Sequence, residues 1–281
     1  MLALGLVLSG CSAVQFSYNQ APTLAYWWLD RYAGFTDQQS PQVKVVLAQW
    51  FAWHRRTQLL PYADALAQTQ RQMSGPIDAG LVCGQWAEWQ QRLTLASQQA
   101  LPAAARLART LDAEQLAQME KHQAKQLEQA RRDYLQPTAA ERQQAMFERH
   151  RKRAEDLYGD LDAAQQRLLR DGVAASPFDA ERWLAVRRGR QQALLRQLRQ
   201  WQARSTDATA AEDGLKRLVA DMVQPAGPED QAYQRRVTEA NCAMAARLHN
   251  STSPTQRQKA VAKLRGWEMD LRALASQMPD A

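Results

Sequence analysis

Apolar residues recur along most of this chain at the spacing of an amphipathic helix. Val43, Leu47, Trp50 and His54 follow one another at intervals of three or four residues, so they share one helical face. Near the end of the chain the same spacing gives an apolar stripe of Val261, Leu264, Trp267, Leu271, Leu274 and Met278. The period-2 alternation of half-buried strands is absent over any useful length. The pattern therefore predicts an all-α fold.

Start and stop signals divide this pattern into many helices. Pro61 interrupts one helix, and Gly75-Pro76 and residues 80–84 mark a loop. Later helices are expected to begin at Asp112, Thr138, Asp162, Asp179, Asp207, Pro228 and Ser253. Because short connections force neighbouring helices to run back on each other, we predict an elongated antiparallel bundle of about eight to ten helices. Residues 11–281 are expected to form this helical domain, with a subdivision near residue 135 as the alternative.

Several expected helix starts share a capping-box pattern. Residues 111–115 and 161–165 have Leu and Asp followed by Gln three residues after the Asp, and residues 35–39 and 252–256 are looser versions. The Asp, Thr or Ser oxygen can accept a free N–H of the first turn, and the Gln can reach back to the cap. The pattern resembles the L-T-x-x-Q signature of Spy and CpxP, which are helical, cradle-shaped periplasmic stress proteins. That resemblance implies a holdase that binds unfolding clients without ATP, although Asp replaces Thr in both closer copies.

The N-terminus carries the most specific motif. An apolar run from Leu2 to Leu8 ends in Leu8-Ser9-Gly10-Cys11, which is the pattern of a bacterial lipobox. The run is too short to span a bilayer, which takes about 20 apolar residues. We therefore predict that residues 1–10 are a lipoprotein signal peptide and that Cys11 is lipidated after cleavage. The alternative is a buried first helix with an incidental Cys.

The lipobox also predicts a location. Ser12 follows Cys11, whereas lipoproteins retained in the inner membrane typically have Asp at that position. We expect the protein to be anchored in the outer membrane and to face the periplasm. This compartment is oxidising, and with Cys11 lipidated the remaining cysteines are an even pair, Cys83 and Cys242. We predict that they form a disulfide, and the alternative is two buried thiols.

A second resemblance lies in the first 65 residues. Tyr18-Asn19, residues 27–32 (WWLDRY), residues 50–56 (WFAWHRR) and Pro61-Tyr62, all after a lipobox, are similar to a family of uncharacterised helical lipoproteins of Gram-negative bacteria. This resemblance implies a location and a helical fold and no established activity.

Candidate catalytic chemistry is sparse. Asp30, Arg31, His54 and Arg55 are a candidate polar cluster, although a histidine in such a setting is more often a satisfied side chain at the edge of a core. The other histidines have no metal-ligand spacing, and no nucleophile elbow or phosphate loop occurs, so we expect no metal, no cofactor and no enzyme. The alternative is an enzyme acting on the cell wall, or a regulator of one, around His54.

Nearby aromatic residues allow two interpretations. They are Tyr26, Trp27, Trp28, Trp50, Trp53, Trp86 and Trp89. The simplest prediction is that they form a core, because large rings dominate core packing. The alternative is that they line a client groove or the face of the protein nearest the membrane.

The basic residues are concentrated in one segment. The chain of 281 residues has a net charge of +7, and residues 142–204 contain 14 Lys or Arg against 8 Asp or Glu. The candidate basic face comprises Arg149, Arg151, Lys152, Arg153, Arg187, Arg188 and Arg190. A periplasmic anchor excludes nucleic acid as a partner, which leaves anionic lipid headgroups, lipopolysaccharide, peptidoglycan carboxylates and acidic clients. We therefore predict a non-catalytic envelope scaffold or holdase; the alternative is a merely solvated helical face.

Overall fold

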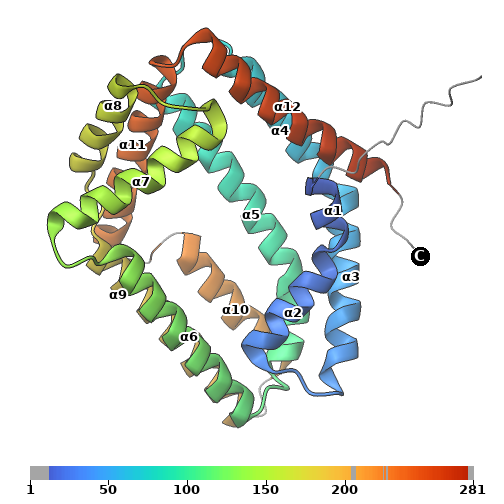
Figure 1. Cartoon of the computed structure of the whole chain (residues 1–281). Coiled ribbons are helices and arrows are strands. Elements are labelled where there is room, and N and C mark those ends of the chain that lie inside the picture. Colours follow the sequence, from blue (N-terminus) through green and yellow to red (C-terminus); the bar gives the residue numbers. More distant parts are fainter. Residues whose placement is uncertain (1–12, 204–206, 224, 226, 278–281) are drawn as a thin grey trace, which may run out of the picture.

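The computed structural model describes residues 13–203, 207–223, 225 and 227–277, and this part of the chain contains helices and no strand (Figure 1). The helices are α1 (Ala13–Asn19), α2 (Ala21–Ala33), α3 (Gln39–Thr57), α4 (Leu59–Gln72), α5 (Ala79–Ala108), α6 (Ala113–Tyr134), α7 (Ala139–Tyr158), α8 (Ala163–Ala174), α9 (Ala180–Ala203), α10 (Ala208–Val223), α11 (Pro228–Asn250) and α12 (Pro254–Ser276). The all-α prediction is confirmed. The signal peptide and Cys11 lie outside the described residues.

The twelve described helices exceed the eight to ten expected. One reason is the seven-residue α1, which a break at Gln20 sets apart from α2. The interruption expected at Pro61 falls at Gln58 instead, which separates α3 from α4 and leaves Pro61 in the first turn of α4. Proline is tolerated in a first turn, where its missing N–H would have no intrahelical acceptor.

The helices α4 and α12 run antiparallel. Along α4 and α12, Asp64 pairs with Arg272 and Gln70 with Glu268, so rising numbers in one helix meet falling numbers in the other. The helix pairs nevertheless point in several directions (Figure 1). The α4–α12 pair, the α2–α3 pair and the α6–α9 pair follow different sides of a four-sided frame, which α5 crosses. The molecule is therefore not the single elongated bundle expected.

Two separate hydrophobic clusters explain this departure. The first joins α2, α5, α6, α9 and α10 around side chains such as Leu101, Leu116 and Trp201. The second joins α4, α7, α8, α11 and α12 around side chains such as Phe147 and Leu169. A single elongated bundle would need one continuous apolar seam, and here the apolar faces converge on two centres. Each cluster draws helices from both sides of residue 135.

The predicted capping boxes are present at the expected helix starts. Asp112 with Gln115, Asp162 with Gln165, and Ser253 with Gln256 each exchange both hydrogen bonds between the cap and the first turn. The looser pattern at residues 36–39 makes the same exchange, since Thr36 N donates to Gln39 Oε1 and Gln39 N donates to Thr36 Oγ1.

These boxes meet in pairs, which their local sequence does not indicate. The Gln39 and Gln115 amides bond to each other, with Nε2 of Gln115 2.7 Å from Oε1 of Gln39 and Nε2 of Gln39 3.3 Å from Oε1 of Gln115. Gln165 and Gln256 do the same at 2.8 and 3.0 Å. We call these two contacts the glutamine pairs. Each one joins two turns that are far apart in the sequence.

The same geometry recurs at all four glutamines. Each Nε2 also donates to the backbone carbonyl two residues before the partner's cap, and the four acceptors are Gly34, Thr110, Asp160 and Ser251. Each Oε1 accepts the N–H of its own cap residue as well. Both amide donors and the carbonyl oxygen of every glutamine are thus satisfied, as burial requires for Gln39, Gln115 and Gln165.

A disulfide joins α5 to α11, and the predicted pairing of Cys83 with Cys242 is confirmed in this structure. The two Cα atoms are 5.5 Å apart, and the residues are 159 positions apart in the sequence. In the chain-entropy model, closing a loop of that length destabilises the unfolded chain by about 5 kcal/mol.

We expect the substitution Gln39→Leu to destabilise the protein by about 3 kcal/mol, because a leucine of similar size leaves the buried amide of Gln115 and the Thr110 carbonyl without their partner. Gln39 and Gln115 are only 7% and 4% exposed, so water cannot replace the lost bonds. Urea unfolding followed by circular dichroism measures the change.

Gln38→Leu is the matched control. Gln38 precedes Gln39 in the chain and is exposed, so its replacement should change the free energy of unfolding by no more than about 0.5 kcal/mol. Equal effects of the two substitutions would show that the glutamine pair contributes nothing specific.

Candidate ligand-binding pocket

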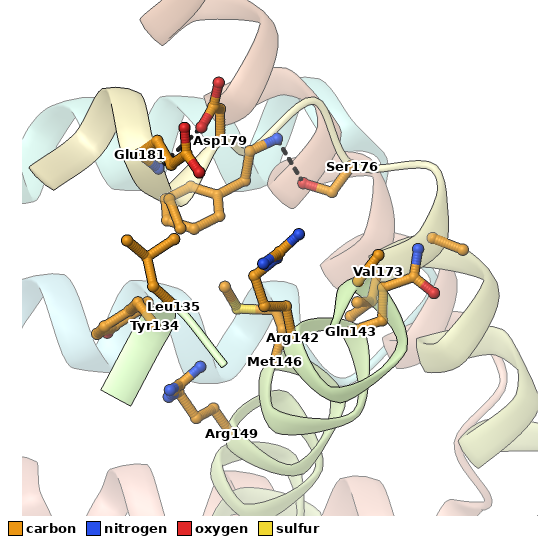
Figure 2. Close-up of a pocket in the computed structure, with 14 residues that line it drawn as sticks. Tyr134, Leu135, Arg142, Gln143, Met146, Arg149, Val173, Ser176, Asp179 and Glu181 are labelled. Carbon is orange, nitrogen blue, oxygen red and sulfur yellow. Dashed lines mark hydrogen bonds between the residues drawn. The ribbon is translucent and has the colours of Figure 1, made fainter. Parts of the chain in front are cut away.

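A pocket of about 410 Å³ opens where α6 ends, α7 begins, α8 ends and α9 begins. One helical face of α7 supplies much of its wall, since Arg142, Met146 and Arg149 follow one another at intervals of three or four residues. The capping box between Thr138 and Glu141 fixes the start of α7 directly after α6. Figure 2 shows the guanidinium groups of Arg142 and Arg149 on the α7 side of this pocket.

Both arginines are held by neighbouring groups. Arg142 Nη1 donates to the backbone carbonyl of Gln136 at 2.9 Å. The guanidinium of Arg149 lies 4.1 Å from the centre of the Tyr134 ring, which is a cation–π contact. The Tyr134 ring in turn packs against Phe178 and Trp183. Since a guanidinium has five N–H donors, each arginine keeps donors for a ligand.

The opposite wall contains two acidic residues, and one of them has a structural task. Asp179 Oδ1 accepts the backbone N–H groups of Glu181 and Arg182 and so caps α9. The remaining lining is largely apolar and includes Leu135, Met146 and Phe178. The pocket thus offers cationic donors beside apolar surface, an arrangement suited to a ligand with an anionic group and an apolar part.

The predicted basic face is divided between two helices. Arg149 lines the pocket, whereas Arg151 on the same helix forms ion pairs with Glu148 and Glu155. Lys152 and Arg153 are exposed and lie outside the pocket lining.

The basic residues of α9 have similar internal contacts. Arg190 donates to the backbone carbonyl of Asp221, and Arg187 lies over the Trp183 ring. Arg188 is exposed. Several of these basic side chains are therefore already in contact with groups of the protein itself, so fewer are available to bind a partner than the sequence suggested.

The candidate polar cluster separates into two groups. Asp30 accepts the backbone N–H of Phe35, and Arg31, which is exposed, offers its carbonyl to Gln118, so both lie where α2 ends. His54 and Arg55, near the end of α3, bond instead to α1, through Tyr18 and Asn19 respectively.

His54 lies among aromatic rings. Its ring stacks on Trp50, with centroids 4.9 Å apart, and meets the edge of Tyr62 at 5.4 Å. The Tyr18 hydroxyl lies 2.8 Å from its Nδ1 atom. Burial lowers the pKa of His54 to about 4, so the ring is neutral at pH 7. A neutral histidine bonded to a tyrosine is typical of a satisfied core side chain.

The aromatic residues expected to form a core lie in different environments. Tyr26 is buried, and Trp50, Trp53 and Trp89 are half-buried. For Trp27, Trp28 and Trp86 the core prediction is wrong, because these side chains are exposed. Adjacent positions on a helix point in different directions, so the contiguous WW pair cannot share the buried face of Tyr26.

Among the residues that the structure describes, no group of three or more His, Cys, Asp and Glu side chains is placed to hold a metal ion. None of the described helices combines the length and the apolar character needed to span a lipid bilayer.

Of these pocket residues, Arg149 was predicted from the sequence as a binding residue, whereas Tyr134, Arg142 and Phe178 were not. Arg142 was counted only as part of the basic segment. The two aromatic residues gave no signal of their own, since they belong to a helix end and a connecting loop that meet only in the fold.

Comparison with known proteins places the chain in a family. A model of a family of unknown function (DUF6279) matches residues 31–224, more than two thirds of the chain. The chain belongs to this family. The match confirms the resemblance to an uncharacterised family, and the DUF6279 region includes the whole pocket. The comparisons do not show the resemblance to Spy and CpxP, and no curated protein and no solved structure matches the chain.

The pKa of His54 predicts how stability depends on pH. The unfolded histidine has a pKa near 6.5, whereas the folded one has a pKa of about 4, so between these values the unfolded state binds more protons. Stability contributed by His54 is therefore complete above pH 6.5 and is lost as the pH falls towards 4.

His54→Phe should reduce this dependence, because phenylalanine does not titrate. The urea midpoint of this variant should fall less between pH 7 and pH 4.5 than that of the wild-type protein. His150 and His249, whose pKa values burial also lowers, should maintain the remaining slope. An NMR titration that placed the pKa of His54 near 6.5 would contradict this account.

Proposed function

We propose that this protein is a periplasmic lipoprotein, anchored in the outer membrane through Cys11, with a non-catalytic binding role. The binding role is supported by the pocket between α6 and α9, in which Arg142 and Arg149 lie beside apolar side chains. The lipobox that ends at Cys11 supports the anchor. The protein would act as an envelope scaffold or as a holdase that needs no nucleotide.

The composition of the pocket favours binding over catalysis. General acid–base catalysis needs a group that exchanges protons near neutral pH, most often a histidine, and the pocket lining contains no histidine or cysteine. One of its two carboxylates, that of Asp179, is occupied by capping α9. Positioned guanidinium groups, in contrast, bind carboxylates and phosphates without a chemical step.

The expected partners carry negative charge beside apolar groups. Acidic client segments with exposed apolar side chains have this chemistry, and so do the anionic components of the envelope. The net charge of +7 favours encounters with such partners at low salt. Phe178 and Met146 would contact the apolar part.

The anchor is tested by growing Gram-negative cells that express the full chain with labelled palmitate. We expect the wild-type protein to incorporate label and to fractionate with the outer membrane, whereas Cys11→Ala should do neither. A native protein without label, recovered in the soluble fraction, would refute the anchor.

The binding role is tested with the Arg142→Gln/Arg149→Gln variant. The probe is an acidic client protein that aggregates on dilution from urea, without ATP and at low salt. We expect the wild-type protein to suppress aggregation and the variant to lose most of this effect, because both pocket cations are gone.

The matched control is Lys152→Gln/Arg153→Gln, which removes the same charge from exposed positions outside the pocket lining. It should retain most of the suppression. If both double variants behaved alike, net charge rather than the pocket would be responsible. If the wild-type protein suppressed nothing, the holdase form of the proposal would fail.

A further inference from the structure

Four large apolar side chains near the N-terminus project away from the fold. Phe16 on α1 and Leu24, Trp27 and Trp28 on α2 are 63%, 58%, 60% and 59% exposed. Isolated exposed apolar residues are ordinary, but a contiguous exposed patch with two tryptophans marks an interaction surface. We call this set the aromatic stripe.

Three of the four side chains follow one helical face of α2. Phe16 lies on α1 before the break at Gln20, whose N–H donates to the Phe16 carbonyl, while Leu24 N donates to Gln20 O. Steps of three and four residues then lead from Leu24 to Trp27 and Trp28. Exposed Arg31 comes one turn later.

The other face of α2 is used for packing, so the stripe is not a sign of a poorly packed helix. Tyr26 is buried, and its hydroxyl donates to Ser40 of α3. Ala33 belongs to the first hydrophobic cluster. The Trp28 ring stacks on Tyr32 with an interplanar angle of 12°, which holds it in place. A rigid helix therefore presents the stripe in a fixed direction.

We propose that the aromatic stripe rests in the interface of the lipid bilayer, beside the acyl chains on Cys11. This inference depends on the lipid anchor of the proposed function. Only Ser12 separates Cys11 from the first residue of α1, Ala13. Two residue steps span at most about 7 Å, so α1 begins at the membrane surface.

The side chains of the aromatic stripe and the charges near it suit contact with a lipid bilayer. Tryptophan and tyrosine are enriched at the level of lipid headgroups, where an apolar body and a polar tip are both accommodated. Residues 13–57, which form α1 to α3, contain four basic and two acidic residues, a balance suited to anionic headgroups. Lipid anchoring that depends on few acyl chains gains from a second membrane contact.

This contact would also orient the protein. With only an acyl tether, the folded domain could rotate freely above the bilayer. With α1 and α2 lying on the surface, the remaining helices would stand in one orientation.

The test uses the full lipidated protein, reconstituted in vesicles of phosphatidylethanolamine and phosphatidylglycerol whose acyl chains are brominated. Bromine quenches tryptophan fluorescence only at short range. We expect clear quenching in the wild-type protein, and we expect the quenched fraction to fall by more than half in Trp27→Phe/Trp28→Phe.

Trp86→Phe is the matched control, because Trp86 is also exposed, at 49%, but lies near the start of α5. It should retain the wild-type quenching. Exposed positions tolerate such substitutions, so both variants should give the circular dichroism spectrum of the wild-type protein.

The outcomes separate the stripe from the anchor. If palmitate were incorporated but quenching were unchanged in Trp27→Phe/Trp28→Phe, the membrane contact of the aromatic stripe would be refuted and the lipid anchor would still be supported. If no palmitate were incorporated, the anchor would be refuted. Quenching of the unlipidated protein by added brominated vesicles would then test by itself whether the aromatic stripe contacts the membrane. Concentration-dependent dimers that dissociate in Trp27→Phe/Trp28→Phe, with no quenching, would assign the stripe to a second copy of the chain.

Discussion

The two glutamine pairs, in which Gln39, Gln115 and Gln165 are buried and Gln256 is half-buried, are the constraint on which the arrangement of the helices depends. A buried amide with unmet hydrogen bonds costs about 1–3 kcal/mol, so each glutamine must find all of its partners. Here those partners include a carbonyl two residues before the other cap, which fixes where the other turn lies and how it faces. Hydrophobic contact alone tolerates sliding of one helix along another, whereas this set of bonds permits one register.

Each pair adjoins a different hydrophobic cluster. Leu111 and Met119 flank the Gln115 box and belong to the first cluster, and Leu161 and Leu169 stand in the same relation to Gln165 and the second cluster. Two turns of the same kind also share a backbone feature, since α2 and α7 both end at a glycine with positive φ, 64° at Gly34 and 79° at Gly159. The same type of paired, capped turn therefore occurs twice, once beside each hydrophobic cluster. The four-sided arrangement follows from the presence of these two clusters.

What the sequence could reveal depended on how local each signal was. Capping boxes were predicted correctly because the cap and its Gln are three residues apart, but nothing within a box says which other box it meets. Cys83 and Cys242 could be paired because one alternative partner, Cys11, was already assigned. Tyr26 and Trp27 carry similar rings, and only the direction in which α2 faces its neighbours decides that one is buried and the other exposed. The pocket was least visible, since Tyr134 and Phe178 become neighbours only when two helix ends meet.

The separation of the paired turns has a consequence for the time course of folding. Helical proteins usually fold quickly, because most of their contacts are local. In this chain the glutamine pairs link residues 76 and 91 positions apart, and the disulfide links residues 159 positions apart. Large loops must therefore close before these contacts form, and loop closure opposes them entropically. Individual helices should appear early, and the four-sided arrangement should follow late and slowly for an all-helical protein, only after residues from both ends of the chain have met.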